Sequence, residues 1–186
     1  MSAFVIRVLA PSDLDAYRAL RQRGFGEHPE AFTSDAAEEA AKPPAEIAKR
    51  LERDSSRPHD AVFGAFDGEL LVGVCGIDVD MRAKVRHKGH VFGLYVPAEH
   101  AGHGVGGALI AKVVEHASSR PDLRQLVLTV TAGDSAARRV YERAGFAACG
   151  REPDAIRVGA RGYDKITMVL FLPAARAPRS RPPENA

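Results

Sequence analysis

The stretch Tyr95–Ala117, YVPAEHAGHGVGGALIAKVVEHA, decides how this chain folds. It contains four glycines, which come directly before an amphipathic run rich in Ala and Val. Glycines in this position either permit a tight turn or leave backbone N–H groups bare at the start of a helix, where they can hold a phosphate. Because one turn rarely needs four glycines, the pattern favours a phosphate-binding loop followed by a helix.

The segments on both sides alternate between strand-like and helix-like patterns. Asp67-Gly68 separates two β-rich runs and predicts a hairpin. Asp134 suits the N-cap of a short helix, and Gly145 follows it as a left-handed terminator. This order of strands and helices predicts a single domain of the mixed α/β class. The expected strands are 4–10, two within 61–81, 87–96, 123–131, 147–158 and 163–172, and the expected helices are 11–25, 44–54, 104–119 and 133–146.

Composition and charge exclude several classes of protein. With 186 residues, 45% hydrophobic and 27% charged, the chain is an ordinary globular sequence. Its net charge of +2 comes from scattered basic residues, so we expect no nucleic-acid partner. We see no signal peptide and no run of transmembrane length, and we therefore expect a cytoplasmic protein without a membrane partner.

The chain ends in a Pro- and Arg-rich tail and contains two cysteines. We expect one domain over residues 1–172 and a disordered tail over 173–186, because the tail has little to bury. Cys75 and Cys149 cannot form a disulfide framework, and we expect both to pack as small hydrophobic side chains in a reducing compartment.

The glycines also match a dinucleotide fingerprint. GHGVGG, Gly102–Gly107, formally satisfies G-x-G-x-x-G. However, PAEHA separates it from the preceding strand, where the fingerprint needs its first glycine almost directly after the strand. No Lys-Ser or Lys-Thr follows, so a nucleotide P-loop also fails. A dinucleotide-binding oxidoreductase domain is therefore the less favoured alternative.

The order of these segments resembles the GNAT superfamily of acyl-CoA-dependent N-acetyltransferases. The resemblance covers roughly residues 4–172, and its specific part is 91–146. The family's pyrophosphate segment R/Q-x-x-G-x-G/A falls on Ala101–Gly106, with Gly104 and Gly106 matching. Its second signature, a helix ending in L-Y-x-x-x-G-F, falls on the segment that follows Asp134 and ends in VYERAGF. Two signatures in the right order are more specific than either one alone.

The resemblance implies a GNAT-like fold with a mixed, mostly antiparallel, twisted sheet flanked by helices. It also implies acetyl-CoA as acyl donor, no metal, and Tyr141 as the general acid that protonates the thiolate. Ala101 departs from the family's Arg or Gln, and Asp134 departs from its Asn. The donor-binding residues carried over are Leu94, Tyr95, Val96, Ala101, Gly102, His103, Gly104, Val105, Gly106, Gly107 and Asp134.

The general base and the acceptor are less well defined by the sequence. His90 lies at the start of a strand where some relatives carry a Glu base, and histidine suits proton removal near neutral pH. An ordinary histidine at a strand end is an equal alternative. Carboxylates beside aromatic rings, Glu30 with Phe25 and Phe32, could hold a cationic amine, although a solvated acidic edge fits equally well.

The expected activity is transfer of an acetyl group to a primary amine. The acceptor is a small-molecule amine or a peptide, and a homodimer is a candidate assembly. A non-catalytic acyl-CoA-binding regulatory module is the alternative that the departures at Ala101 and Asp134 keep open.

Overall fold

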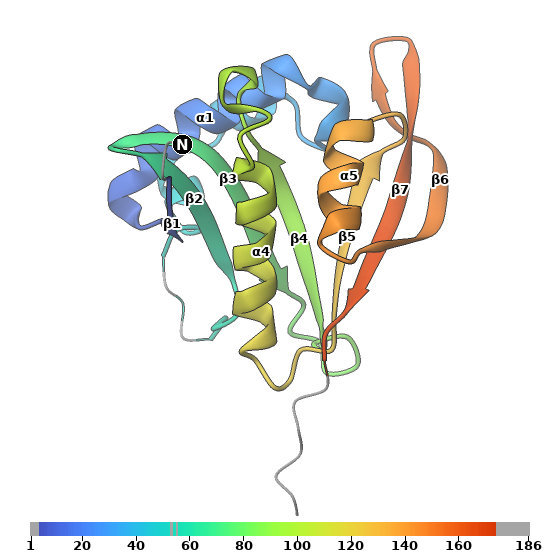
Figure 1. Ribbon diagram of the computed structural model, residues 1–186. Helices are drawn as coiled ribbons and strands as arrows, with labels where there is room; N and C mark the ends of the chain where they lie inside the picture. The colour runs from blue at the N-terminus through green and yellow to red at the C-terminus, as the bar shows by residue number, and fades with distance from the viewer. Residues whose placement is uncertain (1–3, 53, 55, 174–186) are drawn as a thin grey trace, which may run out of the picture.

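A seven-stranded sheet with helices on both faces forms the protein (Figure 1). The computed structural model describes residues 4–52, 54 and 56–173. The sheet order is β1-β2-β3-β4-β5-β7-β6. The strands are β1 Val5–Val8, β2 Ala61–Asp67, β3 Leu70–Val79, β4 Lys88–Tyr95, β5 Gln125–Thr131, β6 Ala147–Val158 and β7 Arg161–Phe171. The helices are α1 Leu14–Glu27, α2 Ala36–Ala41, α3 Pro44–Ala48, α4 Val105–Ser118 and α5 Ser135–Arg143, with 3-10 turns η1 Pro11–Asp13, η2 Pro29–Ala31 and η3 Ala98–His100.

Most of the expected elements are confirmed, including the mixed sheet and the hairpin. The hairpin turn lies one residue later than Asp67-Gly68, because Asp67 still pairs with Leu70 and Gly68 takes a φ of 59°. The helix expected over 44–54 ends at Ala48. Beyond it, the Leu51 N–H bonds to the Ala48 carbonyl at 2.8 Å, and this three-residue spacing tightens the turn.

The two cysteines differ in their exposure to solvent. Cys75 is buried in the core, as expected, and its burial raises the pKa of the thiol to about 12. Cys149 is exposed, so the expectation that it packs as a buried hydrophobe is wrong. It lies on β6, the outermost strand, where one side has no neighbouring strand. Apart from its first residue, the expected tail lies outside the described residues.

The sheet divides where its parallel pair stops. β4 and β5 run parallel, and only Lys88–His90 pairs with Gln125–Val127. All other strand pairs of the described sheet are antiparallel. Both strands continue beyond the paired segment and diverge toward the top of the view in Figure 1. The divergence leaves an opening in the middle of the sheet.

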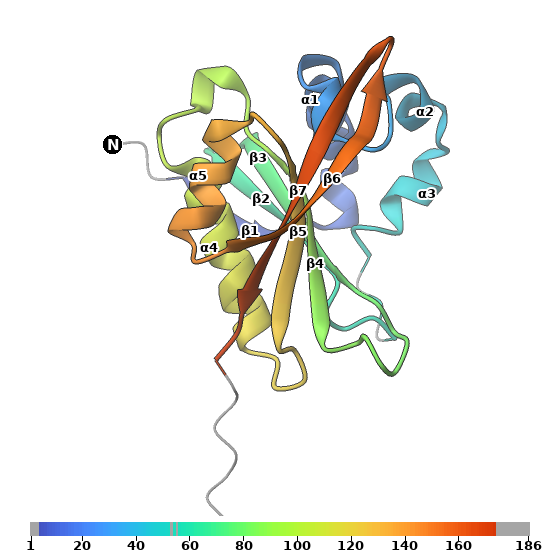
Figure 2. The same cartoon turned by 90° about the vertical axis from the view of Figure 1, so that its right-hand side faces the viewer.

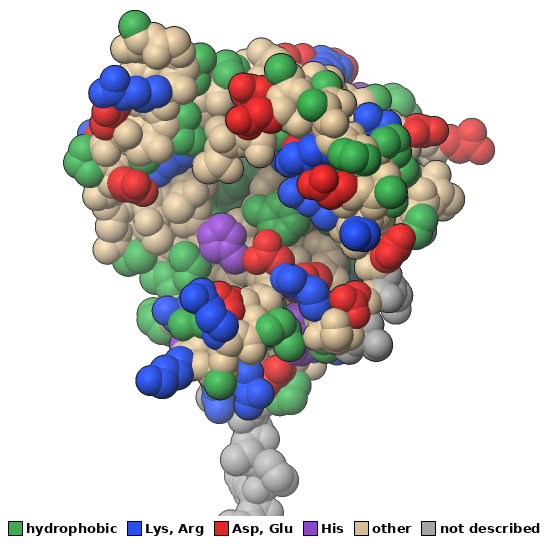
Figure 3. Space-filling view, turned by 180° about the vertical axis from the view of Figure 1, so that it is seen from behind, with side chains coloured by type: hydrophobic (Ala, Val, Ile, Leu, Met, Phe, Trp, Pro, Cys, Tyr) green, Lys and Arg blue, Asp and Glu red, His purple; other side chains and the backbone are tan. Residues whose placement is uncertain are grey.

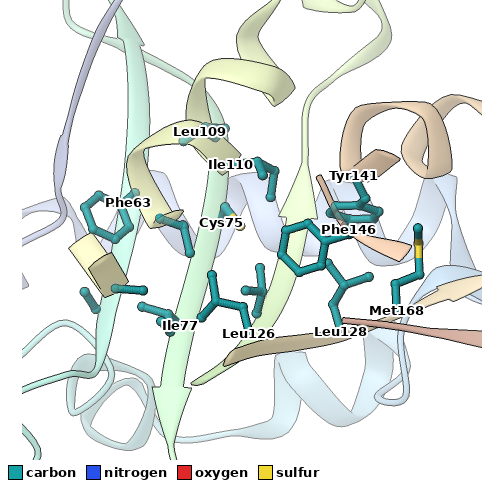
Figure 4. Packing of buried hydrophobic residues seen from close by; sticks show 14 of the residues in the cluster. Phe63, Cys75, Ile77, Leu109, Ile110, Leu126, Leu128, Tyr141, Phe146 and Met168 are labelled. Atoms are coloured by element: carbon teal, nitrogen blue, oxygen red, sulfur yellow. The ribbon is translucent and has the colours of Figure 1, made fainter. Parts of the chain in front are cut away.

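Helices cover the two faces of the sheet and enclose two hydrophobic clusters. α4 and α5 lie on one face, and α1, α2 and α3 lie on the other (Figure 2). The first cluster joins α4 residues such as Leu109 and Ile110 to Leu126 and Met168, all completely or almost completely buried (Figure 4). Burying one such side chain stabilises the fold by about 1.5–3 kcal/mol. These contacts hold α4, and therefore the glycine loop at its start, in a fixed position against the sheet.

Candidate active site

A cavity of about 640 Å³ opens where β4 and β5 diverge. The ends of the central strands, α1, α5 and the segment after α3 supply its walls. Figure 3 shows the face covered by α1, α2 and α3, which is hollowed in its centre and has acidic and basic side chains around the hollow. The cavity brings together residues that lie far apart in the sequence, among them His90 and Tyr141.

Tyr141 reaches the cavity from α5. Its ring packs edge-on against Phe146 with centroids 6.0 Å apart, and the side chain is only 7% exposed (Figure 4). Within the described part of the chain its hydroxyl makes no hydrogen bond. Burial raises the pKa of the phenol well above its ordinary value, and the nearby Cys75 and Asp134 add to this effect. Tyr141 therefore presents a protonated hydroxyl with a free donor to the cavity.

His90 and Asp78 face each other across β3 and β4. The two residues are paired in the strand register, and both line the cavity. Burial raises the pKa of the Asp78 carboxyl, and the neighbouring His90 opposes this effect. The Asp78 carboxylate accepts no hydrogen bond from any described residue. The pair therefore offers two proton acceptors at one wall of the cavity.

β4 contains a bulge next to this pair. Val74 of β3 pairs with Tyr95, whereas Gly76 pairs with Phe92, so β4 has one extra residue in this interval. Gly93 supplies the bulge with a φ of 64°, a left-handed conformation that favours glycine. The bulge interrupts the ladder and leaves backbone groups near Leu94 facing the cavity. Tyr95 itself turns toward α1, where its hydroxyl donates to Glu27 Oε2 at 2.7 Å.

The glycine loop lies at the start of α4. Gly104 is the N-cap with a φ of 84°, and it has no side chain to cap the helix. The N–H groups of Val105, Gly106 and Gly107 have no acceptor within the helix, because the first turn of a helix cannot supply one. A Cβ on Gly107 would meet nothing within 4 Å, so the approach to this first turn is open. The first turn of α4 thus has N–H groups available to an anion.

Asp134 caps α5 and lines the cavity. Its carboxylate accepts a hydrogen bond from the Ala137 N–H at 3.0 Å, which confirms the expected N-cap. Ala101 and His103 are exposed in the glycine loop. Of the carried-over strand residues Leu94, Tyr95 and Val96, only Leu94 lines the cavity.

The two rings expected to hold a cationic amine already hold a cation of the chain. The Arg21 guanidinium lies 4.4 Å from the Phe25 centroid and 4.8 Å from the Phe32 centroid. A second cation between the same rings would be repelled, so this geometry speaks against the expected role. Glu30 does not line the cavity. Its carboxylate Oε1 lies 3.7 Å from the His28 Nδ1.

Lys165 fastens one edge of the cavity. From β7 its Nζ donates to the carbonyls of Glu30 and Ala31 at 3.1 and 2.9 Å, and to Thr131 Oγ1 at 2.9 Å. The Thr131 hydroxyl in turn donates to the Glu30 carbonyl at 2.8 Å. Burial lowers the pKa of Lys165. This network connects η2 to β5 and β7.

Asp78, Arg21 and Lys165 were not among the residues that the sequence singled out. Asp78 and Lys165 carry no local signal, because only the strand register and long-range packing bring them to the cavity. Arg21 has one signal, since it precedes Phe25 by four residues on the same helix and can therefore contact its ring. No group of three or more His, Cys, Asp or Glu side chains in the described residues is arranged to hold a metal ion.

A family model described as the acetyltransferase (GNAT) family matches residues 16–146. The chain belongs to this GNAT family. GNAT membership and a sheet with one parallel pair also exclude the dinucleotide-binding alternative, which requires a mostly parallel sheet. No curated protein matches the sequence.

Solved structures have the same GNAT fold. A GNAT acetyltransferase from Streptococcus pneumoniae is 24% identical with a TM-score of 0.83, over 92% of this chain and 100% of that chain. Ribosomal-protein-alanine N-acetyltransferase from Brucella melitensis is 24% identical with a TM-score of 0.77, over 90% and 99%. An acetyltransferase from Salmonella typhimurium, solved with its cofactor acetyl-CoA, is 19% identical with a TM-score of 0.75, over 96% and 99%. In the described residues, no helix has the length and apolar character needed to cross a membrane.

Proposed function

We propose that this GNAT protein transfers an acetyl group from acetyl-CoA to a primary amine, with Tyr141 as the general acid. The observation that carries the proposal is the Tyr141 hydroxyl, which faces the cavity without a hydrogen-bond partner among the described residues. The cavity lies at the opening between β4 and β5 and has two proton acceptors on its wall. This combination supports acid–base chemistry between two ligands that meet inside the sheet.

The donor's pyrophosphate binds at the start of α4. Gly102, His103 and Gly104 form the loop, and Val105, Gly106 and Gly107 contribute N–H groups that have no intrahelical acceptor. The helix dipole adds about 0.3–1 kcal/mol of attraction for an anion at an exposed site. The backbone beside the β4 bulge, at Leu94–Val96, holds the pantetheine arm and polarises the thioester carbonyl. Acetyl-CoA supplies the activated acetyl group.

The chain's own residues move the protons. Asp78 and His90 take a proton from the acceptor ammonium, and the free amine attacks the thioester carbonyl carbon. The C–N bond forms and the C–S bond breaks, with the electron pair leaving on sulfur. Tyr141 donates its hydrogen bond and then its proton to that sulfur, which leaves as a thiol. The proton that the nitrogen loses as the amide forms returns to the Tyr141 oxygen. The raised pKa keeps Tyr141 protonated, so the phenol is present as a hydrogen-bond donor when thiolate character develops.

A second candidate function is a non-catalytic acyl-CoA-binding regulatory module. Ala101, which lacks the polar side chain usual in the family, and Asp134, which brings a negative charge to the cavity, favour it. This module would bind acetyl-CoA without releasing CoA.

Calorimetric titration with acetyl-CoA and a thiol-release assay with a panel of amines test the proposal. Tyr141→Phe keeps the ring and its contact with Phe146, so we expect acetyl-CoA affinity and stability to change little. Turnover should fall by roughly 10²–10⁴-fold, because the donor is lost where thiolate character develops. Normal turnover of Tyr141→Phe would contradict the acid role. Tight acetyl-CoA binding with no acetylation of any amine would favour the regulatory module.

A further inference from the structure

Arg21 is a buried cation whose charge the protein leaves uncompensated. It is 8% exposed, and the Nε and Nη1 atoms are fully buried without a hydrogen-bond partner in the described residues. An unpaired buried guanidinium is costly, because it loses its water and gains no hydrogen bond in return. The rings of Phe25 and Phe32 offset part of this cost and fix the plane of the guanidinium.

No neighbouring carboxylate is available to neutralise Arg21. Glu39 of α2 is buried nearby, and its charge favours the charged form of Arg21. However, Glu39 Oε2 accepts a hydrogen bond from Lys42 Nζ at 2.6 Å, and Glu39 Oε1 lies 4.0 Å from Arg50 Nη1. Glu39 is thus shared between two other cations. Arg21 lines the cavity, and its guanidinium donates no hydrogen bond to any described residue.

Arg21 lies beside the β4 bulge. A Cβ built on Gly93 would be 2.8 Å from Arg21 Nη1, so the guanidinium touches the bulge itself. Leu94, the next residue, belongs to the backbone segment proposed to polarise the thioester. A group bound by Arg21 would therefore lie close to the proposed position of the thioester, where the amine attacks.

We propose that Arg21 binds the carboxylate of the acceptor and that the acceptor is a free α-amino acid. The inference rests on the proposed acetyl transfer. A guanidinium donates charge-assisted hydrogen bonds to a carboxylate, and an α-amino acid carries its carboxylate one carbon away from its amine. The N-terminus of a peptide lacks this group, since its first carboxyl is part of an amide. The site thus selects free amino acids over peptide N-termini and simple amines.

The experiment compares each standard L-amino acid with its α-carboxamide as acceptor for the full-length protein. Both carry the same α-amine, and the ammonium of the carboxamide loses its proton more readily. A preference for the acid therefore cannot come from a more available amine. For the amino acid that the protein uses, we expect kcat/KM to exceed that of its amide by roughly 10- to 100-fold, the range for a lost charge-assisted pair. Calorimetry with the same compounds, in the presence of CoA, measures binding without turnover.

Two variants assign the preference to Arg21. Arg21→Met keeps an unbranched side chain between the rings and removes the donors, so the ratio of acid to amide should fall close to one. Arg18→Met is the matched control, because Arg18 lies on the same helix but does not line this cavity, and it should keep the wild-type ratio. Arg21→Lys retains the charge without the guanidinium group and should give an intermediate ratio. It also provides a variant of Arg21 if the Met variant folds poorly.

The outcomes separate the inference from the proposed function. If the wild-type protein acetylates an amine but neither binds nor acetylates any amino acid better than its amide, the carboxylate inference is wrong and acetyl transfer stands. If Arg21→Met keeps the wild-type ratio, the carboxylate site lies elsewhere and the inference is wrong. Failure to bind acetyl-CoA at all would instead overturn the proposed function.

Discussion

At the scale of single residues, the pKa of the Asp78 carboxyl depends on both its burial and the charges around it. Its carboxyl is partly buried, and burial raises its pKa above the ordinary value of 3.8. Charged His90, Arg57 and Arg50 lower the pKa, whereas Asp60 raises it. A proton acceptor with a raised pKa is useful in a site that must deprotonate an ammonium group. The burial that destabilises the carboxylate therefore also makes it a better base.

The pH profile of acetylation tests this role. Asp78 must be ionised to accept a proton, so kcat/KM should fall as the pH drops through its raised pKa. His90→Gln removes a charge that lowers this pKa, so the acidic limb should move to higher pH. In Asp78→Asn, the fall of kcat/KM at low pH that arises from protonation of Asp78 should disappear. An acidic limb that Asp78→Asn leaves unchanged would assign the proton to His90 alone.

Thermal unfolding supplies an independent check on Asp78. A carboxyl with a raised folded pKa binds more protons in the folded state, so its contribution to stability falls as the pH rises. Asp78→Asn should therefore be more stable than the wild type at pH 7. This advantage should disappear below about pH 4, where both folded and unfolded carboxyls are protonated. A less stable Asn variant at pH 7 would mean that the carboxylate is structural.

At the scale of elements, the glycines at the start of α4 differ in whether the backbone conformation requires them. Gly104 needs glycine, because its φ of 84° strains any side chain. Gly106 does not, since it is helical and a Cβ there would meet only ordinary contacts near 3.9 Å. A substitution at Gly106 can therefore change the electrostatics of the loop without disturbing its backbone.

Gly106→Asp should weaken acetyl-CoA binding while preserving the fold. An acid in the first turn stabilises the helix, but it repels the pyrophosphate by about 2–3 kcal/mol, which is roughly 30- to 150-fold in Kd. Gly106→Asn has the same size without the charge, and it should lose much less affinity. Calorimetric titration of both variants makes the comparison. Equal affinities for the Asp and Asn variants would place the pyrophosphate away from this turn.

At the scale of the whole molecule, Lys165 links η2 to the far half of the sheet. Lys165→Met removes three hydrogen bonds and leaves the Glu30 and Ala31 carbonyls with fewer donors. We expect a loss of about 2–3 kcal/mol in the free energy of unfolding and roughly 5–10 °C in Tm. The KM for the acceptor should rise more than the Kd for acetyl-CoA, because η2 precedes Phe32 at the acceptor side. Lys84→Met, at an exposed turn, is the control; equal effects of the two variants would contradict the role of Lys165.

The sequence predicted those parts of the fold and site that depend on neighbouring residues. The α4 loop and Tyr141 carry their signals within a few residues, and the structure has the loop at the start of α4 and Tyr141 at the cavity. Lys165 and Asp78 reach the cavity through strand register and contacts across the chain, which no local pattern encodes. Phe25 and Phe32 were expected to hold a cation from the acceptor, but in the structure their cationic partner is Arg21. Two neighbouring aromatic rings indicate a site for a cation, but the sequence pattern does not show whether that cation belongs to a ligand or to a side chain of the protein.

The short parallel pairing of β4 with β5 determines the order in which the chain can assemble. β1 to β4 pair among themselves, and so do β5 to β7, so each half can form its ladders without the other. Pairing β4 with β5 requires the connection through α4 to close, and it forms only three residue pairs. The loss of chain entropy on closing this loop comes before most of the stabilising contacts between the halves have formed. We therefore expect docking of the two halves to be a late step of folding. During refolding, sheet structure should appear before acetyl-CoA binding, because the cavity does not exist until the halves meet.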